Sequence, residues 1–218
     1  MDPILVAAPP RCGTSMIAGL LVKHGVQVGY HRGPHKDNPK GGFENEQIKY
    51  ILQNELSNNG YALNPIRHIR MRQQVYDLAP SPVFKDVVED AIENPDSPWL
   101  FKEFRILMTW LQWMRYFPHA VYILNRRNKA DNLQSMKVHP AISKRGPAED
   151  LEAWIDWAHH RQEEIADKCP HVWCDVDKVW QGDMDEARKV VEGCGLTFDE
   201  QVAKEWIDPE LWHNRSGV

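Results

Sequence analysis

The stretch ILVAAPPRCGTS, residues 4–15, decides the fold class of this protein. Its first five residues, 4–8, form an uninterrupted apolar run, which is typical of a strand buried inside a parallel sheet. Two prolines and Gly13 then predict a tight turn. From Thr14 to about His24 apolar residues recur at helical spacing, and Gly25 ends that helix. The order of strand, glycine-bearing turn and helix predicts a phosphate-binding βα unit.

The same alternation continues along the rest of the chain. Short apolar runs predict three further strands, at 99–102, 121–124 and 171–174. Helical spacing predicts further helices at about 46–56, 106–117, 130–136 and 151–168. The polar, proline-punctuated region 60–97 is expected to hold one or two helices. Strands that alternate with helices indicate an α/β fold with a parallel sheet flanked by helices.

Composition excludes several classes of protein. A chain of 218 residues with ordinary composition suits one domain, residues 1–218. Its net charge of −5 argues against a general nucleic-acid binder, which usually carries a basic excess. No apolar run is long enough to span a bilayer, and no secretory signal is visible at the start. Four cysteines in a chain of this length predict free thiols and a cytoplasmic location.

The turn after the first strand carries groups that bind anions. A helix N-terminus offers free N–H groups and the positive end of the helix dipole. Gly13 lets the backbone approach an anion, Thr14 and Ser15 add hydroxyl donors, and Arg11 adds charge. A nucleoside-triphosphate loop needs a Lys directly after its second Gly, and Thr14 occupies that place. A P-loop nucleotide kinase is therefore the weaker interpretation, with Asp175 as its only candidate for the Mg²⁺-binding Asp.

The segment Pro10–Ser15 resembles the 5′-phosphosulfate loop of sulfotransferases that use 3′-phosphoadenosine 5′-phosphosulfate (PAPS). Cys12 departs from that pattern, since Ser is commoner there, but its backbone N–H serves equally well. The resemblance implies a P-loop nucleotide-kinase-like three-layer fold. It also implies transfer of a sulfonate group from PAPS to a hydroxyl or amine acceptor, with adenosine 3′,5′-bisphosphate as the product and no metal.

A second resemblance follows the strand at 121–124. Ser135 stands eight positions after Arg127, and the family places an Arg and a Ser at this spacing on the 3′-phosphate of PAPS. An Arg offers a fork of donors that matches a phosphate. Lys129 replaces a Pro that is frequent in the family, and Arg126 is an alternative phosphate ligand. The carboxyl ends of parallel strands lie at one edge, so both anion sites are expected there.

Sulfonate transfer also needs a base and cations near the sulfur. Asn38-Pro39-Lys40-Gly41-Gly42-Phe43-Glu44 resembles a segment of bacterial-type sulfotransferases, and Glu44 is the candidate base. Cytosolic members of the wider family use a His, so His31 and His35 remain alternatives. The run from Lys102 to Arg105 resembles a Lys-Asp-Pro-Arg-like segment whose Lys faces the reaction centre. Lys102 and Arg11 are therefore expected to steady the sulfonate or the bridging oxygen.

Several points stay open from the sequence. The acceptor is a small molecule, carbohydrate, lipid or peptide, and the candidates for its pocket are the aromatic and Met residues at 100–117 and the region 60–97. A binding protein that has lost catalysis is a further alternative, and the oligomeric state is undetermined. A zinc site at Cys169, His171 and Cys174 is not expected, because no second ligand pair follows. The segment beginning at Asp208 resembles a C-terminal segment of bacterial sulfotransferase-like proteins and is expected to pack or line a pocket.

Overall fold

The computed structural model describes residues 1–34, 38–64, 66, 69, 84–92, 94 and 96–211. Its elements, in chain order, are β1 (Ile4–Val6), α1 (Thr14–Lys23), α2 (Glu46–Asn58), α4 (Phe84–Asp90), β2 (Leu100–Lys102), α5 (Ile106–Tyr116), β3 (Val121–Arg126), α6 (Lys129–Val138), α7 (Pro140–Ser143), α8 (Ala148–Ala166), β4 (His171–Asp175), α9 (Val176–Trp180), α10 (Met184–Gly193), α11 (Glu200–Trp206) and a 3₁₀ turn, Pro209–Leu211.

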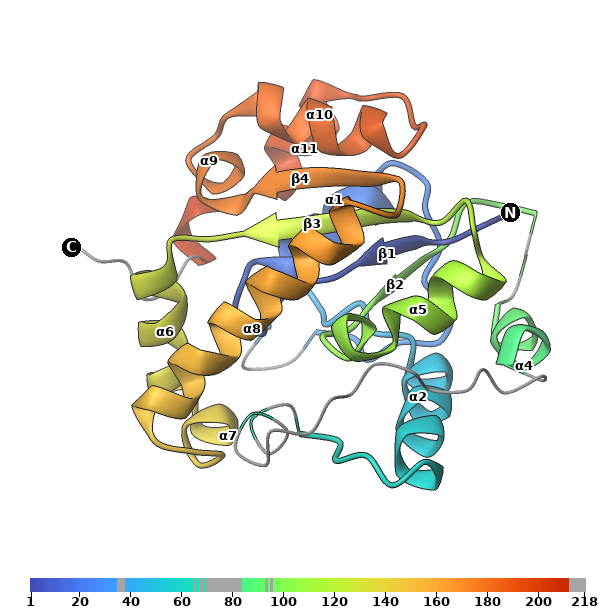
Figure 1. Ribbon diagram of the computed structural model, residues 1–218. Coiled ribbons are helices and arrows are strands. Elements are labelled where there is room, and N and C mark those ends of the chain that lie inside the picture. The colour runs from blue at the N-terminus through green and yellow to red at the C-terminus, as the bar shows by residue number, and fades with distance from the viewer. Residues whose placement is uncertain are drawn as a thin grey trace.

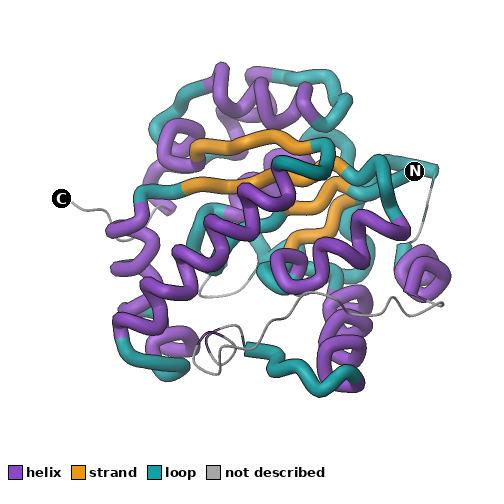
Figure 2. The backbone as a smooth tube through the Cα atoms, viewed as in Figure 1, coloured by secondary structure: helices purple, strands orange, loops and turns teal. Residues whose placement is uncertain are grey.

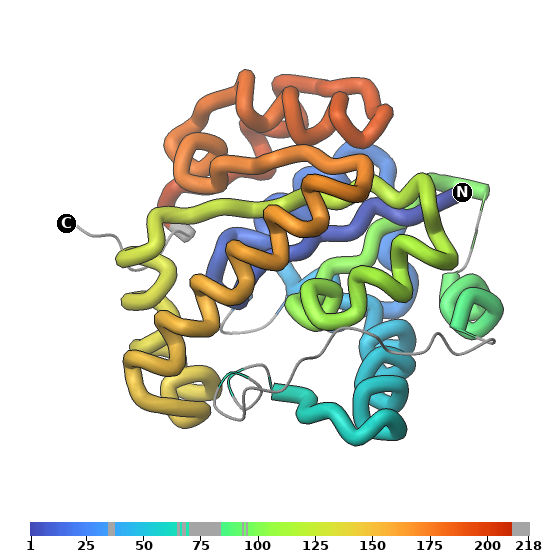
Figure 3. Tube along the Cα trace, in the orientation of Figure 1, coloured from blue at the N-terminus to red at the C-terminus, as the bar shows by residue number. Residues whose placement is uncertain are grey.

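The four strands form one parallel sheet in the order β2-β1-β3-β4. The first strand, β1, therefore lies inside the sheet, between β2 and β3, as the colours along the chain show in Figure 3. Helices surround the strands in Figure 2. The predicted fold class, an α/β protein with a parallel sheet flanked by helices, is confirmed.

Alternate residues of β1 face two separate apolar layers. Ile4 and Val6 pack with residues of α1, α10 and α11. Leu5 packs on the other face with residues of α2, α4, α5 and α8. Figure 1 shows α5 and α8 in front of the sheet and α1 behind it. Because both faces are covered, the strands are apolar on both sides and read as continuous apolar runs in the sequence.

The chain leaves β1 and β3 toward opposite edges of the sheet. The chain passes from β1 to β2 at one edge of the sheet and from β3 to β4 at the other. In open α/β sheets this reversal opens a crevice beyond the carboxyl ends of the two strands, and ligands bind in such crevices. The turn 9–13 and the segment Arg126–Asn128 lie at these two strand ends, so the fold brings the two predicted anion sites together.

The elements lie close to their predicted positions, with some differences. The first strand ends at Val6, two residues earlier than expected, and α8 begins at Ala148 instead of Leu151. Within region 60–97 the structure describes α4, and much of the remainder lies outside the described residues. Among the described residues, no helix is both long enough and apolar enough to cross a bilayer.

Residues 100–117, sequence-based candidates for an acceptor pocket, have two different environments. Lys102, Glu103 and Phe104 line a cavity. The aromatic residues of α5 instead pack in the core, where Trp113 stacks on Phe101 with ring centroids 5.5 Å apart. Apolar rings at helical spacing gain more free energy from burial between the sheet and α8 than from a wet cavity wall.

Candidate functional site

The turn after β1 presents an uncapped helix N-terminus. Gly13 is the N-cap of α1, and no side chain caps the first turn. Its φ of 64° lies in the left-handed region, and a Cβ at this position would lie 3.1 Å from the Val176 side chain. Arg11 also has a positive φ, 65°, which is uncommon for a residue with a Cβ. The exposed N–H groups and the dipole of α1 therefore favour a bound anion here.

Side chains of β3, of α6 and of the residue Arg127 between them donate hydrogen bonds to the carbonyl groups of this turn. Asn132 Nδ2 donates to Pro10 O at 2.9 Å, and Asn125 Nδ2 donates to Cys12 O at 3.1 Å. Arg127 Nη1 donates to Arg11 O at 3.0 Å. Three consecutive carbonyl groups are thus bound by residues of the β3–α6 segment, which fixes the turn without a ligand.

Cys12 is a buried structural thiol. Its Sγ–H points at Asn125 O, 3.5 Å away. Burial raises the pKa of the thiol to about 12, against a smaller opposing effect of the Arg127 charge. Cys12 is therefore protonated at neutral pH and unreactive, and it contributes to the site through its backbone.

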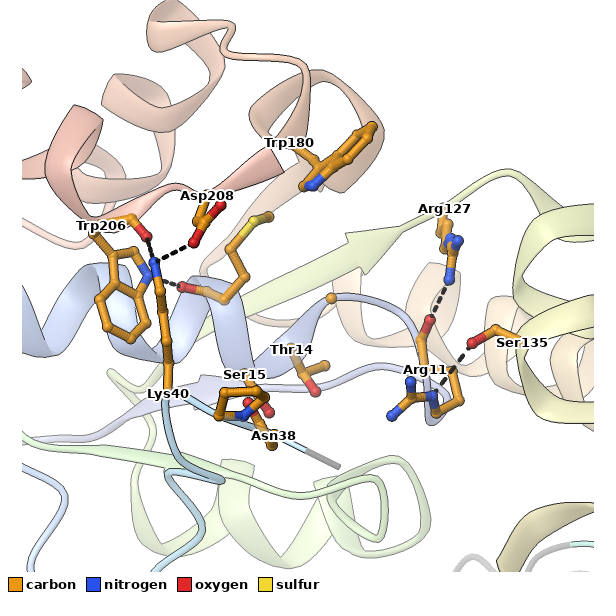
Figure 4. Close-up of a pocket in the computed structure, with 13 residues that line it drawn as sticks. Arg11, Thr14, Ser15, Asn38, Lys40, Arg127, Ser135, Trp180, Trp206 and Asp208 are labelled. Carbon is orange, nitrogen blue, oxygen red and sulfur yellow. Dashed lines mark hydrogen bonds and ion pairs between the residues drawn. The ribbon is translucent and has the colours of Figure 1, made fainter. Parts of the chain in front are cut away.

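Arg11, Arg127 and Ser135 converge on one side of the crevice, as Figure 4 shows. Arg11 Nε donates to Ser135 Oγ at 3.3 Å. The Arg127 side chain is 3% exposed, and its Nε lies 3.9 Å from Asp177 Oδ1. The fold thus brings these three residues together from the β1 turn, the end of β3 and helix α6.

Arg126, the alternative phosphate ligand, belongs to a different surface. Its Nε donates to Gln162 Oε1 at 2.9 Å, and its Nη2 pairs with Glu163 on α8. Its guanidinium also lies over the Trp173 ring, 4.6 Å from the centroid. Neither of the two cavities at the crevice has Arg126 in its lining, whereas Arg127 lines the first.

The first cavity has a volume of about 170 Å³. It has the turn 9–13 and the start of α1 at its centre, the two arginines on one side and tryptophans on another (Figure 4). Its lining consists of Arg11, Gly13, Thr14, Ser15, Met16, Asn38, Pro39, Lys40, Arg127, Ser135, Trp180, Trp206 and Asp208. Cationic groups, hydroxyls and aromatic rings in one cavity suit an anionic ligand that also carries a flat base.

Lys40 joins the wall of this cavity to the C-terminal segment. Its Nζ donates to Trp206 O at 2.6 Å and lies 3.6 Å from Asp208 Oδ2. Trp206 Nε1 in turn donates to Met16 O at 2.8 Å. The Trp206 ring packs so closely on Gly19 that a Cβ there would lie 2.0 Å from it. The sequence left packing or pocket lining open for the segment beginning at Asp208, and Asp208 lines this cavity; sequence reasoning assigned no role to Lys40 or Trp206.

A second group of charged residues lies beside the start of α1. Lys102 Nζ is 2.9 Å from Glu44 Oε1 and donates to Ser15 Oγ at 3.1 Å. Lys49 lies 3.5 Å from the other Glu44 oxygen. Burial raises the pKa of Glu44, but the Lys102 and Lys49 charges outweigh it and lower the pKa below its ordinary value. Glu44 is therefore ionised at neutral pH, as a proton acceptor must be.

Glu44 does not begin the following helix. Asn45 is the N-cap of α2, and its side chain accepts hydrogen bonds from the N–H groups of Gln47 and Ile48. The cap role falls to Asn45, so helix capping does not account for Glu44. Its carboxylate lines the second cavity.

Glu103 and Arg105 form a buried pair next to this centre. Glu103 accepts hydrogen bonds from Arg105 on both carboxylate oxygens, one from the backbone N–H and one from Nη1. Burial raises the pKa of Glu103 to about 7, although the Arg105 charge opposes the shift. Arg105 thus fixes the Glu103 carboxylate, and the carboxylate in turn fixes the Arg105 side chain.

The other predicted candidates lie elsewhere. His31 stacks on Phe43 and its Nδ1 contacts Gly29 O at 2.9 Å; neither cavity has it in its lining. His35 lies outside the described residues. Asp175 caps α9 by accepting hydrogen bonds from the N–H groups of Asp177 and Lys178. A capping role accounts for Asp175 without a metal.

The parallel sheet, with the glycine-bearing turn 9–13 at its switch point, defines an α/β fold. The crystal structure of the sulfotransferase STF1 from Mycobacterium tuberculosis H37Rv is similar to this chain, with a TM-score of 0.54 and 14% sequence identity. The similarity covers 94% of this chain and 70% of that one. It shows a sulfotransferase-like fold. No family model matches the sequence, and no curated protein does.

Proposed function

We propose that this protein is an enzyme, a sulfotransferase that moves a sulfonate group from PAPS to a hydroxyl or amine acceptor. The observation that carries the proposal is that two groups of charged and polar residues flank one turn at the sheet edge. This turn, residues 9–13, is the proposed anion-binding turn. It has Arg127 and Ser135 on one side and the Lys102–Glu44 pair on the other. A donor with two separate anionic groups and a transferable sulfonate needs binding groups and reacting groups in this order.

The residues of the first cavity fit the donor. The N–H groups of the turn, with Thr14 and Ser15, would bind the 5′-phosphosulfate. Arg127 and Ser135 would bind the 3′-phosphate, where the buried guanidinium gives strong charge-assisted hydrogen bonds. The aromatic side chains of Trp180 and Trp206 suit the adenine base.

The proposed transfer step forms one bond to sulfur and breaks another. The acceptor oxygen or nitrogen forms a bond to sulfur, and the bond between sulfur and the bridging oxygen breaks. The electron pair of that bond passes to the phosphate oxygen, and the acceptor proton passes to Glu44. Lys102 and Arg11 would stabilise the charge that develops on the departing phosphate. Lys102 pairs with Glu44 in the present structure, so a move of its ammonium toward the donor would release the carboxylate as a base.

Features of the site speak against a nucleotide kinase. Thr14 stands where a triphosphate loop has its Lys, and Asp175 is a helix cap. Without these groups, the charge of a triphosphate and its Mg²⁺ has no dedicated ligands at the turn. A sulfonate is less charged than a phosphoryl group and needs less of this apparatus.

Calorimetry with adenosine 3′,5′-bisphosphate and with ATP, each with and without Mg²⁺, tests the proposal. We expect metal-independent binding of the bisphosphate in the micromolar range and much weaker binding of ATP. Transfer of ³⁵S from labelled PAPS to an acceptor panel then tests the reaction, with Glu44→Gln as the variant that lacks the base. Preference for Mg²⁺-ATP would replace the proposal with a kinase, and donor binding without any transfer would indicate a binding protein.

A further inference from the structure

The second cavity, with a volume of about 450 Å³, opens beside the reacting groups. It shares Arg11, Thr14 and Ser15 with the first cavity and adds Lys102 and Glu44. A further part of its wall comes from His139, from Ala141 and Ile142 of α7, and from Arg145 just after that helix. A molecule in this cavity would contact Lys102 and Glu44 as well as residues at α7. Under the proposed function, this is the position of the acceptor.

The carboxylates that line this cavity, within the described residues, already have cationic partners. Glu44 pairs with Lys102 and Lys49, and Glu46 pairs with Lys49. Both oxygens of Glu103 accept hydrogen bonds from Arg105. The negative charge of the wall is thus neutralised by neighbouring residues and is not available to a cationic ligand.

Arg145 is a half-buried cation on the same wall that pairs with no carboxylate in the described part of the chain. Arg145 lies just beyond α7, its Nε donates to Ala141 O at 3.1 Å, and the residue lines the second cavity. Burial, and then the like charge of Arg105, lower the pKa of Arg145, whereas the Glu103 carboxylate opposes them. A partly desolvated guanidinium of this kind gains most from an incoming anion.

Arg32 is another cation of the cavity lining, at an exposed position. It does not pair with a carboxylate either, as far as the described residues show. Arg145 and Arg32 are thus two lining cations without a carboxylate partner in the described part of the chain, whereas each lining carboxylate has a cationic partner besides Lys102 and Arg11. An apolar acceptor would leave the Arg145 charge desolvated and unpaired, at a cost in free energy.

We propose that the acceptor is a small hydrophilic molecule with an anionic group, a carboxylate or a phosphate, that binds Arg145 while its hydroxyl or amine faces Glu44. This inference rests on the proposed function for the position of the reacting end. The anionic group fixes which hydroxyl of the acceptor reaches Glu44, because the guanidinium binds a planar carboxylate or a phosphate in a defined orientation. Arg145 is then the residue that selects the acceptor.

Matched compounds test the proposal by calorimetry on protein saturated with adenosine 3′,5′-bisphosphate. One set is glucose, glucuronate and glucose 6-phosphate, and the other is 4-hydroxybenzamide and 4-hydroxybenzoate. In at least one set, we expect the anionic member to bind roughly tenfold to a hundredfold more tightly than its neutral counterpart. The two anionic sugars distinguish a carboxylate from a phosphate.

Arg145→Gln should abolish this preference, and Arg145→Lys should keep part of it. The control is Lys144→Gln, which removes the same charge from an exposed neighbour that does not line the cavity; it should leave the preference intact. Equal binding of neutral and anionic members, no binding of any anionic compound, or an unchanged preference in Arg145→Gln would overturn the proposal. If the bisphosphate itself does not bind, the same titrations on the free protein test Arg145 separately from the sulfotransferase proposal.

Discussion

Replacement of Arg127 by Ala tests the donor site most directly. The Arg127 side chain is 3% exposed, so solvent would screen its contact with a bound phosphate only weakly. A hydrogen bond that involves a charged group contributes about 1.5–3 kcal/mol, and the buried setting favours the upper half of this range. Arg127→Ala also removes the donor to Arg11 O and loosens the anion-binding turn. We therefore expect a loss of about 2–3 kcal/mol, or roughly 30- to 150-fold in the Kd for adenosine 3′,5′-bisphosphate.

Arg126→Ala is the matched control for this experiment. It removes the same side chain one position earlier, where the guanidinium pairs with Glu163 and lies outside both cavities. Calorimetry on the wild type and the two variants, with thermal unfolding to check the fold, should show weakened binding for Arg127→Ala alone. An unchanged Kd for Arg127→Ala, or an equal loss for Arg126→Ala, would refute the assignment of the 3′-phosphate to Arg127.

Three further changes probe the reaction centre, the core and the pH dependence. Lys102→Met should lower kcat roughly 100-fold or more while the bisphosphate Kd changes little; the reverse result would make Lys102 a donor-binding residue. Gly19→Ala places a Cβ against the Trp206 ring and should cost about 1–3 kcal/mol, measured as a lower Tm, whereas Gly33→Ala, where the added Cβ meets no atom within 4 Å, should not. The pKa of Glu103 is raised to about 7 by burial, so the folded state holds this proton more tightly than the unfolded state. The protonated form of Glu103 therefore stabilises the folded state. This stabilisation is complete below about pH 4 and is lost as the pH rises through 7, so the free energy of unfolding declines by a few kcal/mol. Glu103→Gln should flatten this decline in denaturant titrations between pH 4 and 8, and an equally steep decline in the variant would contradict the assignment.

The fold could be predicted from local patterns because each strand is buried on both faces. Continuous apolar runs such as 121–124 therefore stand out from the amphipathic helices between them. The ends of the strands were less predictable. The apolar run continues past the end of β1, because β1 and β3 separate where the crevice opens. There Gln162 Nε2, on α8, donates to Ala7 O and to Asn125 O at 2.9 Å each. No local pattern announces a side chain that bonds two strands from a distant helix.

Part of the candidate site was predictable from the resemblance to sulfotransferases. That resemblance singled out Arg127 and Ser135 by their spacing, and the structure brings both residues to Arg11. The contacts of Lys40 with Trp206 and of Lys102 with Ser15 join residues far apart in the sequence. Such contacts depend on how loops pack on the finished sheet, which periodicity and spacing do not encode.

The bond between Lys40 and the Trp206–Asp208 segment has a consequence for biosynthesis. A nascent chain that has emerged from the ribosome only as far as residue 200 already contains all four strands, the anion-binding turn and both arginines. It still lacks Trp206 and Asp208, which close one wall of the first cavity. The sheet can therefore form cotranslationally, but the cavity is completed only after these two residues emerge. Cotranslational capture of a nucleotide should be correspondingly weak until that point.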